Sequence, residues 1–266
     1  MDLLNAIILG LVQGLTEFLP VSSSGHLVLT QEILGVEDHG VTFEVAVHFG
    51  TLLSVLVYFW KSLWRMVLAI MPPFKEEYAA DRKMILYLAV ASIPAAIIGF
   101  SPAKGAFESV YEKPAIVGLL LIVTGLLLFL PRILANRGKG EMSLKTAIVM
   151  GIGQAFAILP GVSRSGSTIV AGIMAGTKSS LAAEFSFLMA IPAIAAASVL
   201  ECEHLGAISS EVLTSYLVGA VVAFASGLLA IFTVLAAIRK GKFEYFGIYC
   251  LIAGLSAFLY FTYGVA

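Results

Sequence analysis

The first candidate for chemistry is a polar motif inside an apolar stretch near the start of the chain, Gln13-Gly-Leu-Thr-Glu-Phe-Leu-Pro-Val-Ser-Ser-Ser-Gly-His26. Gln13 and Glu17 stand four residues apart, so on a helix they share one face. Pro20 ends such a helix, because the residue before a proline is excluded from the α region. The serines at 22–24 then start a new helix by capping its free N–H groups. A helix that begins inside an apolar region directs its positive end at the break, so the motif predicts an anion site beside a carboxylate.

The motif recurs later in the chain with different charged residues. A shift of 141 residues aligns, without a gap, Gln13 with Gln154, Ser22 with Ser163 and Ser24 with Ser165. Arg164 then aligns with Ser23, and Ile158 aligns with Glu17. The two copies are therefore not redundant, since the first carries Glu17 and His26 and the second carries Arg164 and Thr168.

The composition is that of a polytopic membrane protein. Hydrophobic residues make up 59% of the chain, charged residues 12%, and the mean hydropathy is +0.98, far from the soluble norm of roughly 25% charged residues. The net charge of −1 excludes a strongly basic nucleic-acid binder. Cys202 and Cys250 lack the spacing of a metal site or a disulfide framework. The Met1-Asp2 start lacks a basic region, so we expect no cleaved signal peptide.

Apolar segments predict an all-α membrane domain over residues 1–266. Six of them approach or exceed the ~20 residues that cross a bilayer as a helix: 43–60, 84–101, 115–131, 181–200, 212–238 and 243–263. The segments around the two serine motifs, 2–19 with 22–36 and 144–159 with 166–176, are pairs of helices broken by Pro and Ser. We interpret each pair as a re-entrant hairpin that enters and leaves on one side.

Loop charges then give a topology. Basic residues follow the first, third and fifth spans: Lys61, Arg65, Lys75, Arg82, Lys83, Arg132, Arg137, Lys139, Lys145, Arg239, Lys240 and Lys242. The other loops contain Lys104, Lys113, Glu108, Glu112, Glu201, Glu203, His204 and Glu211. The positive-inside rule places the basic loops in the cytoplasm, which requires that neither hairpin crosses the membrane. The prediction is two inverted-topology repeats, about 1–135 and 143–266, each a hairpin plus three transmembrane helices, whose serine motifs meet near the midplane.

Ionisable residues in apolar segments are costly and therefore candidates for function. Glu17 with Gln13 suits metal binding or general base catalysis, and the alternative is a buried carboxylate bonded to the nearby serines. His26, in the first turn of a helix, suits a neutral ring that acts as base or nucleophile; the alternative is a ring bonded to a backbone carbonyl. The Arg164 guanidinium suits phosphate oxygens.

Several polar residues have structural alternatives. Arg164 could instead pair with Glu44 or Glu184. The hydroxyl residues of the second motif, Ser163, Ser165, Ser167 and Thr168, could pack or cap membrane helices as readily as bind phosphate. Glu44 and His48 are four apart and could pair, and with Glu184 we interpret them as a supporting polar network.

Both motifs resemble those of the undecaprenyl-diphosphate phosphatases, the bacitracin-resistance family of bacterial membranes. The resemblance is carried by Gln13 to His26, by Pro160-Gly-Val-Ser-Arg-Ser-Gly-Ser-Thr168, by Thr42-Phe-Glu44 and by Glu184-Phe-Ser-Phe, and it extends over nearly the whole chain. It implies hydrolysis of undecaprenyl diphosphate with a divalent cation, Mg²⁺ or Ca²⁺, at the outer (periplasmic) face of the plasma membrane. The family pattern accepts Glu or Gln at position 13, so a metal here depends on Glu17 as the motif's carboxylate. His48 is not recognised as part of that pattern.

These observations assign roles to the motif residues. Ser23 is the expected nucleophile, Glu17 its base, and His26 the group that protonates the leaving oxygen or activates water; His26 or water as the nucleophile stays open. Phosphate binding is assigned to Ser22, Ser24, Ser163, Arg164, Ser165 and Thr168, and the metal to Glu17 and Gln13. The expected partners are the prenyl diphosphate and membrane lipid, without nucleic acid, and a homodimer is left open. The competing function is a transporter or flippase for a lipid phosphate or another anion, because broken helices in inverted repeats are typical of transporters.

Overall fold

The computed structural model describes residues 1–36, 41–102, 105, 107, 109–134, 138–201 and 210–264. These residues form helices joined by turns, with one isolated bridge between Gly140 and Thr177, so the predicted all-α class is confirmed. Five helices in this part of the chain are long and apolar enough to cross a membrane, or six if a bent pair forms one span. They correspond to the six predicted spans.

The first predicted span is the bent pair. Helix α3 (Val41–Tyr58) is followed after one residue by α4 (Trp60–Ala69), and the two are bent by 76°. The sequence predicted that the span ends at residue 60 and that a charged loop follows. The chain stays helical there because no glycine or proline occurs between Trp60 and Ala69 to interrupt it.

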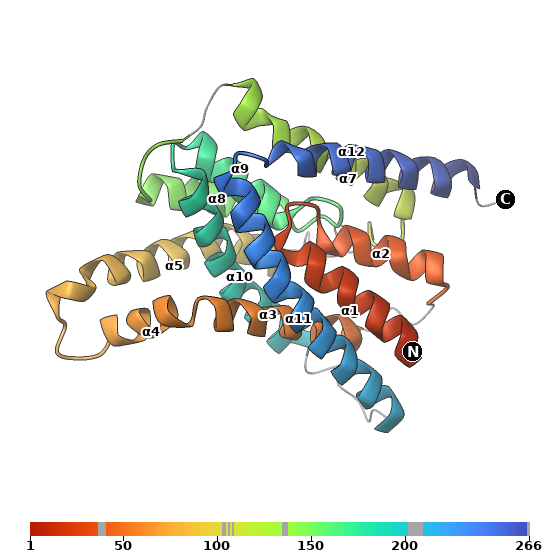
Figure 1. The fold of residues 1–266 in the computed structure, drawn as a ribbon, viewed down its shortest axis with the longest axis horizontal. Helices are drawn as coiled ribbons and strands as arrows, with labels where there is room; N and C mark the ends of the chain where they lie inside the picture. The colour runs from red at the N-terminus through yellow and green to blue at the C-terminus, as the bar shows by residue number, and fades with distance from the viewer. Residues whose placement is uncertain are drawn as a thin grey trace.

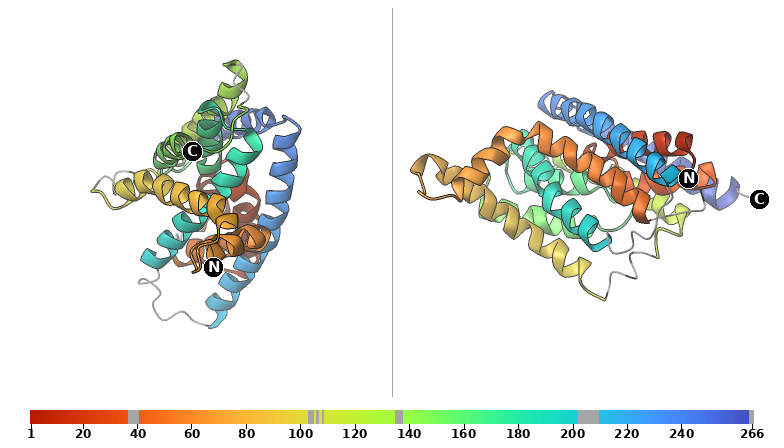
Figure 2. Two further views of the ribbon diagram at one scale, coloured as in Figure 1. Left: turned by 90° about the vertical axis from the view of Figure 1, so that its left-hand side faces the viewer. Right: turned by 90° about the horizontal axis from the view of Figure 1, so that it is seen from below.

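The other long helices follow in order. They are α5 (Ala79–Gly99) after the short turn η1 (Glu76–Tyr78), α7 (Pro114–Ile133), α10 (Ser179–Glu201), α11 (Ser210–Arg239) and α12 (Glu244–Leu259), which ends in the turn η3 (Tyr260–Gly264). Figure 1 shows both chain termini at one end of the molecule, with the α4–α5 connection at the opposite end. The right-hand view of Figure 2 again shows both termini at the end opposite the α4–α5 connection.

Two segments are pairs of short helices, as predicted. Helix α1 (Leu3–Phe18) pairs with α2 (Ser23–Leu34), and α8 (Leu144–Phe156) pairs with α9 (Arg164–Met174). The 16 residues of α1 span about 24 Å at 1.5 Å per residue, less than a bilayer core. Leu19 is extended because it precedes Pro20, and α1 ends there. Figure 1 shows α1 and α2 side by side, with their turn near the centre of the molecule.

The core joins the two halves of the chain around these breaks. Its largest cluster contains Phe18 of α1, Ile169 of α9, Phe187 of α10 and Ile231 of α11, all fully or nearly fully buried. The rings of Phe18 and Phe187 meet edge to face with centroids 5.5 Å apart. Since Phe18 directly follows Glu17, this packing fixes the end of α1 at the position from which the carboxylate extends.

Candidate active site

The break between α1 and α2 (the first break) contacts the break between α8 and α9 (the second break). Ser22 Oγ accepts a hydrogen bond from the backbone N–H of Gly161 at 3.1 Å, and Ser165 Oγ donates to the carbonyl of Leu19 at 2.9 Å. A methyl group on Gly25 would lie 2.9 Å from Gly161 Cα, so glycine is required for this close approach. The structure therefore brings the two serine motifs together, as the sequence predicted.

Thr124 of α7 holds the second break from the other side. Its hydroxyl donates to the carbonyl of Gly161 at 2.8 Å and accepts from the backbone N–H of Ser163 at 3.0 Å. The side chain is 1% exposed, so water cannot replace either bond. The sequence reasoning missed Thr124, because a threonine inside an apolar helix is an ordinary packing residue.

Both helices that start at the breaks are capped by the predicted serines. Ser22 Oγ accepts from the N–H of Gly25, and Ser163 Oγ accepts from the N–H of Gly166. The first two N–H groups of each helix have no partner within the helix. They belong to Ser23 and Ser24 in α2 and to Arg164 and Ser165 in α9. Two positive helix ends thus direct backbone donors at one region, which suits an anion.

The Ser22 backbone is strained at this junction. Its φ is +70°, a value that costs energy for a residue with a side chain. The surrounding bonds enforce it, since the Ser22 hydroxyl binds both breaks and its carbonyl accepts from the N–H of His26 at 3.1 Å. The strained turn presents Ser23 as the first residue of α2.

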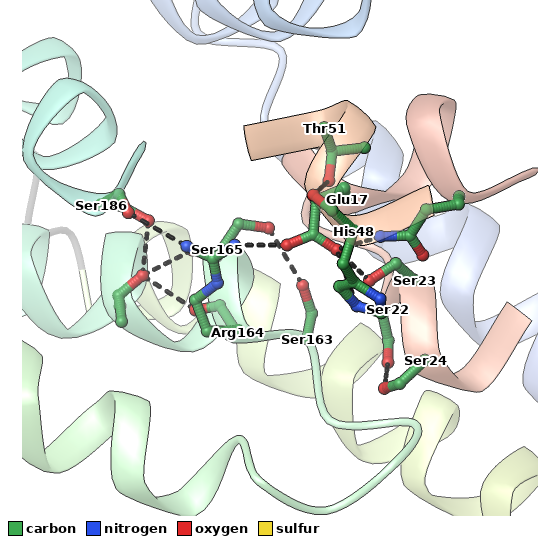
Figure 3. Close-up of polar contacts among 12 residues, drawn as sticks. Glu17, Ser22, Ser23, Ser24, His48, Thr51, Ser163, Arg164, Ser165 and Ser186 are labelled. Atoms are coloured by element: carbon green, nitrogen blue, oxygen red, sulfur yellow. Dashed lines mark hydrogen bonds and ion pairs between the residues drawn. The ribbon is translucent and has the colours of Figure 1, made fainter. Parts of the chain in front are cut away.

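Glu17 is the centre of the polar cluster (Figure 3). Its Oε2 accepts from the Ser23 hydroxyl at 2.5 Å and from Gln13 Nε2 at 2.9 Å, and its Oε1 accepts from an Nη of Arg164. The Glu17 and Arg164 side chains are 6% and 16% exposed. Arg164 also donates to the carbonyl of Ser186 at 3.3 Å. One carboxylate thus joins the serine of one break to the arginine of the other.

His48 of α3 lies beside the same carboxylate, at 4.0 Å from Nε2 to Glu17 Oε2. Its Nδ1 is 2.7 Å from the carbonyl oxygen of Glu44. The possible pairing of His48 with Glu44 is therefore made through the Glu44 main chain. Within the described residues, Arg164 forms no ion pair with Glu44 or Glu184, the alternatives that the sequence left open.

His26 faces a different neighbour. Its Nδ1 is 2.8 Å from the Ser22 carbonyl and its Nε2 is 2.8 Å from the hydroxyl of Tyr249 on α12. The two rings are stacked with centroids 5.6 Å apart. No hydrogen bond or ion pair joins His26 to Glu17 in the part of the chain that the structure describes. Sequence reasoning missed Tyr249, which lies 223 residues away along the chain.

The remaining predicted phosphate ligands mostly hold the site together. Ser163 and Ser165 have hydroxyls 3.2 Å apart, and both are 1% exposed. Thr168 is fully buried, with its hydroxyl 2.6 Å from that of Ser186, the serine of the Glu184-Phe-Ser-Phe stretch, to which the sequence assigned no role. Ser24 is partly buried, with its hydroxyl 3.4 Å from that of Ser22. Ser23 and Ser24 lie nearest to solvent among the motif serines.

Glu17 and Gln13 are the predicted metal ligands. Among the described residues no three His, Cys, Asp or Glu side chains gather as a metal cluster. Gln13 is fully buried, and its Oε1 has no hydrogen-bond partner in the described structure. Cys250 is buried, with a free thiol 3.8 Å from the Pro20 carbonyl.

Some positions from the sequence analysis lie outside the described residues. These are Cys202, Lys104, Glu108, Arg137, Glu203 and His204.

Comparison with known proteins identifies the family of the chain. A profile of the family described as bacitracin resistance protein BacA matches residues 6–256. The chain is similar to an undecaprenyl-diphosphatase of Halothermothrix orenii, with 40% identity over 96% of each chain. It is 41% identical to an undecaprenyl-diphosphatase of Methanobrevibacter smithii over 97% of this chain and 98% of that protein. A third, from Syntrophotalea carbinolica, is 42% identical over 96% of this chain and 97% of that one. The chain therefore belongs to the bacitracin resistance protein BacA family and is a multi-pass membrane protein.

Proposed function

We propose that this chain hydrolyses undecaprenyl diphosphate to undecaprenyl phosphate and phosphate. It thereby recycles the lipid carrier for cell-wall synthesis and confers resistance to bacitracin. The observation that carries the proposal is the shared carboxylate: Glu17 binds the Ser23 hydroxyl through one oxygen and Arg164 through the other. A hydroxyl, an acceptor for its proton and a fixed positive charge thus meet at two helix starts, the combination that phosphoryl transfer requires.

The diphosphate binds between the two breaks. The backbone N–H groups at the starts of α2 and α9 and the Arg164 guanidinium bind its oxygens, because helix ends and guanidinium groups favour phosphate. Ser24 adds a hydroxyl from the first turn of α2. Ser163, Ser165 and Thr168 act mainly by fixing the second turn, since their hydroxyls contact one another or other protein groups.

Ser23 attacks the terminal phosphorus. Its oxygen forms the new P–O bond while the bond from phosphorus to the bridging oxygen breaks, and undecaprenyl phosphate leaves with that oxygen. The hydroxyl proton passes to Glu17 Oε2, which already accepts it in a hydrogen bond of 2.5 Å. Arg164 and the N–H groups stabilise the charge on the equatorial oxygens. Water then cleaves the phosphoserine and restores Ser23.

His26 activates that water. The Ser22 carbonyl can only accept, so Nδ1 carries the ring hydrogen and Nε2 accepts from the Tyr249 hydroxyl. A ring in this tautomer has an unprotonated Nε2 and is suited to take a proton. Because the Tyr249 hydroxyl is hydrogen-bonded to Nε2, water can bind His26 Nε2 only after the Tyr249 side chain moves away.

The residues present fit a divalent cation shared with the substrate. Glu17 provides a carboxylate, and the buried Oε1 of Gln13 is an oxygen without a hydrogen-bond partner among the described residues. Mg²⁺ is commonly bound by one or two carboxylates together with substrate phosphates. Glu17 and Gln13 would hold the cation, which would neutralise phosphate charge, while Ser23 and Arg164 act directly on the substrate.

The two halves form inverted repeats in this proposal, and equivalent helices make equivalent contacts. Helix α1 packs on α11, as α8 packs on α5. A methyl group on Gly10 would lie 2.4 Å from the Gly219 carbonyl oxygen, and one on Gly151 would lie 2.5 Å from that of Ala91. Gly10 and Gly151 are separated by the same 141 residues as the serine motifs. The repeats, about 1–135 and 143–266, form one membrane domain.

The orientation follows from charge. Lys75 lies in the α4–α5 connection and Arg82 and Lys83 lie near the start of α5, at the end opposite both termini (Figure 1). The positive-inside rule places that end in the cytoplasm, so α1 and α2 enter from the outer face of the plasma membrane. Ser23 and Ser24, which are partly exposed, belong to this hairpin. We therefore propose that the site opens outward.

The experiment is phosphate release from undecaprenyl diphosphate by purified protein in detergent, with and without a chelator. Glu17→Ala and Arg164→Ala should each abolish release. Ser92→Ala is the matched control, because the Ser92 hydroxyl only binds the carbonyl of its own helix. With substrate labelled in the terminal phosphate, wild type should trap a phosphoenzyme and Ser23→Ala should not. A labelled intermediate that persists in Ser23→Ala would assign the nucleophile elsewhere.

The competing function is transport of a lipid phosphate or another anion. A folded wild type that binds the lipid diphosphate but releases no phosphate would favour it. Glu17 and His26 would then be groups that couple ion movement to substrate movement.

A further inference from the structure

His48 occupies a position beside Glu17 for which the mechanism above has no use. The two residues come from different helices, α3 and α1, and their side chains point toward one another in Figure 3. Nε2 of His48 lies 4.0 Å from Glu17 Oε2, too far for a direct hydrogen bond. The His48 side chain is 29% exposed and that of Glu17 only 6%, so His48 forms the more open side of the pair.

The tautomer of His48 is set by its other ring nitrogen. Nδ1 is 2.7 Å from the Glu44 carbonyl oxygen, which can only accept, so Nδ1 carries the hydrogen. Nε2 forms no hydrogen bond among the described residues and, in the neutral ring, presents a lone pair toward the Glu17 carboxylate. The positive charge that these two acceptors need between them can come from a proton on Nε2, which gives an ion pair with Glu17, or from a bound cation.

We propose that His48 Nε2 is a nitrogen ligand of the divalent cation that Glu17 holds, and that the site for this reason takes Mn²⁺ in preference to Ca²⁺. The inference rests on the proposed cation in the phosphatase site. Histidines that bind metals almost always donate their other ring N–H to a carboxylate, a backbone carbonyl or water, and the Glu44 carbonyl provides that bond.

The spacing suits a shared ion. Metal–ligand distances are about 2.1–2.4 Å for oxygen and nitrogen donors, so one ion can contact two atoms that are up to about 4.2–4.8 Å apart. The 4.0 Å between Nε2 and Oε2 falls within this limit without movement of either helix.

Gln13 can complete the protein ligands. Its amide nitrogen contacts the same Glu17 oxygen at 2.9 Å, while its Oε1 is buried and lacks a hydrogen-bond partner in the described structure. An amide flip exchanges the two atoms. In the presence of a cation, the flip would direct Oε1 at it.

The donor set determines which cation is favoured. Carboxylate and amide oxygens suit Mg²⁺, Ca²⁺ and Mn²⁺ alike. Ca²⁺ is a hard cation that takes oxygen ligands, so an imidazole nitrogen in the donor set disfavours Ca²⁺ relative to a transition metal such as Mn²⁺. A set of one carboxylate, one amide oxygen and one imidazole therefore favours Mn²⁺ over Ca²⁺. Without the imidazole, the affinity for Mn²⁺ should fall by at least about 10-fold, the lower end of the range seen when an outer-shell partner of a metal ligand is removed, and the preference over Ca²⁺ should fall with it.

The test uses Mn²⁺ as the probe and reads its ligands by pulsed electron paramagnetic resonance on the full-length protein in detergent. Wild type should show coupling of bound Mn²⁺ to an imidazole ¹⁴N. His48→Gln should keep bound Mn²⁺ but lose the coupling, because glutamine offers an oxygen at a similar reach. His26→Gln is the matched control and should keep the coupling. Competition with Ca²⁺ should show the reduced preference in His48→Gln alone.

Three results would overturn the inference: wild type that binds no Mn²⁺, bound Mn²⁺ without nitrogen coupling, or coupling that persists in His48→Gln. Phosphate release is measured on the same preparations. Wild type that binds Mn²⁺ through His48 yet releases no phosphate would refute the phosphatase alone. Wild type that releases phosphate without nitrogen coupling would refute the His48 assignment alone.

Discussion

The ion pair between Glu17 and Arg164 should stabilise the fold as well as serve the chemistry, and a double-mutant cycle separates the two contributions. The variants are Glu17→Gln, Arg164→Met and the pair combined. Arg164→Met leaves a carboxylate buried beside Phe18 without its counter-charge, whereas the double variant leaves no charge. We expect the double variant to be more stable than the sum of the single changes predicts, although it remains inactive.

The expected loss of stability in Arg164→Met follows from the burial of the ion pair. The two side chains are 6% and 16% exposed, so the pair is a buried one, for which removal of one partner costs about 3–5 kcal/mol. Two hydrogen bonds to Glu17, from Ser23 and Gln13, survive in Arg164→Met and place the cost toward the lower end of that range. The interaction energy from the cycle should be about 0.5–3 kcal/mol, as found for residues in contact.

The assay is equilibrium unfolding in mixed micelles, with phosphate release measured in parallel. The pair between Lys178 and Glu141 is the control, because these side chains are 50% and 74% exposed and exposed pairs contribute about 0–1 kcal/mol. Strictly additive effects for Glu17 and Arg164, or a coupling no larger than that of the control pair, would refute the reasoning. Recovery of activity in the double variant would refute the catalytic roles.

Three further predictions follow from the same structure. Thr124→Val should lower the free energy of unfolding by about 1–3 kcal/mol, because it leaves buried main-chain groups of the second break unpaired; thermal unfolding and kcat check this, with Thr124→Ser as the conservative control. Gly25→Ala should lower the free energy of unfolding by about 1–3 kcal/mol and remove most of the activity, since its methyl would lie 2.9 Å from the backbone of the second break. Gly99→Ala is the control and should be neutral in both assays, because a methyl there meets nothing within 4 Å. Cysteines placed at Glu112 and Lys178, in a chain freed of its own cysteines, should react with impermeant reagents from opposite sides of the membrane; reaction of both from one side would contradict the inverted arrangement.

Much of the fold could be predicted because its signals are local. Pro20 sets the end of α1 through the geometry of the residue before it, and Ser22 and Ser163 cap α2 and α9 as residues of that type do. Long apolar stretches indicated the spans for the same reason, since bilayer thickness fixes their length. The helix α4 was missed because its charges suggested a loop.

The partners within the site could not be predicted in the same way. Glu17 and Arg164 are 147 residues apart, and the sequence offered Glu44 and Glu184 as equally reasonable partners for the arginine. His48 gave a signal, an ionisable residue in an apolar segment, but its position beside Glu17 depends on how α3 packs on α1. Tyr249 gave no such signal in the sequence, because tyrosines are common in membrane helices.

The division of the ion pair between the two halves of the chain has a consequence for biosynthesis. A ribosome adds about 5–20 residues per second, so Arg164 is made roughly 7–30 s after Glu17 at a sequence separation of 147 residues. During that interval the first hairpin holds an acid whose partner does not yet exist. Ser23, Glu17 and Arg164, the proposed nucleophile, base and phosphate ligand, come together only when the second half has been inserted, so we expect a nascent or truncated chain in the membrane to be inactive.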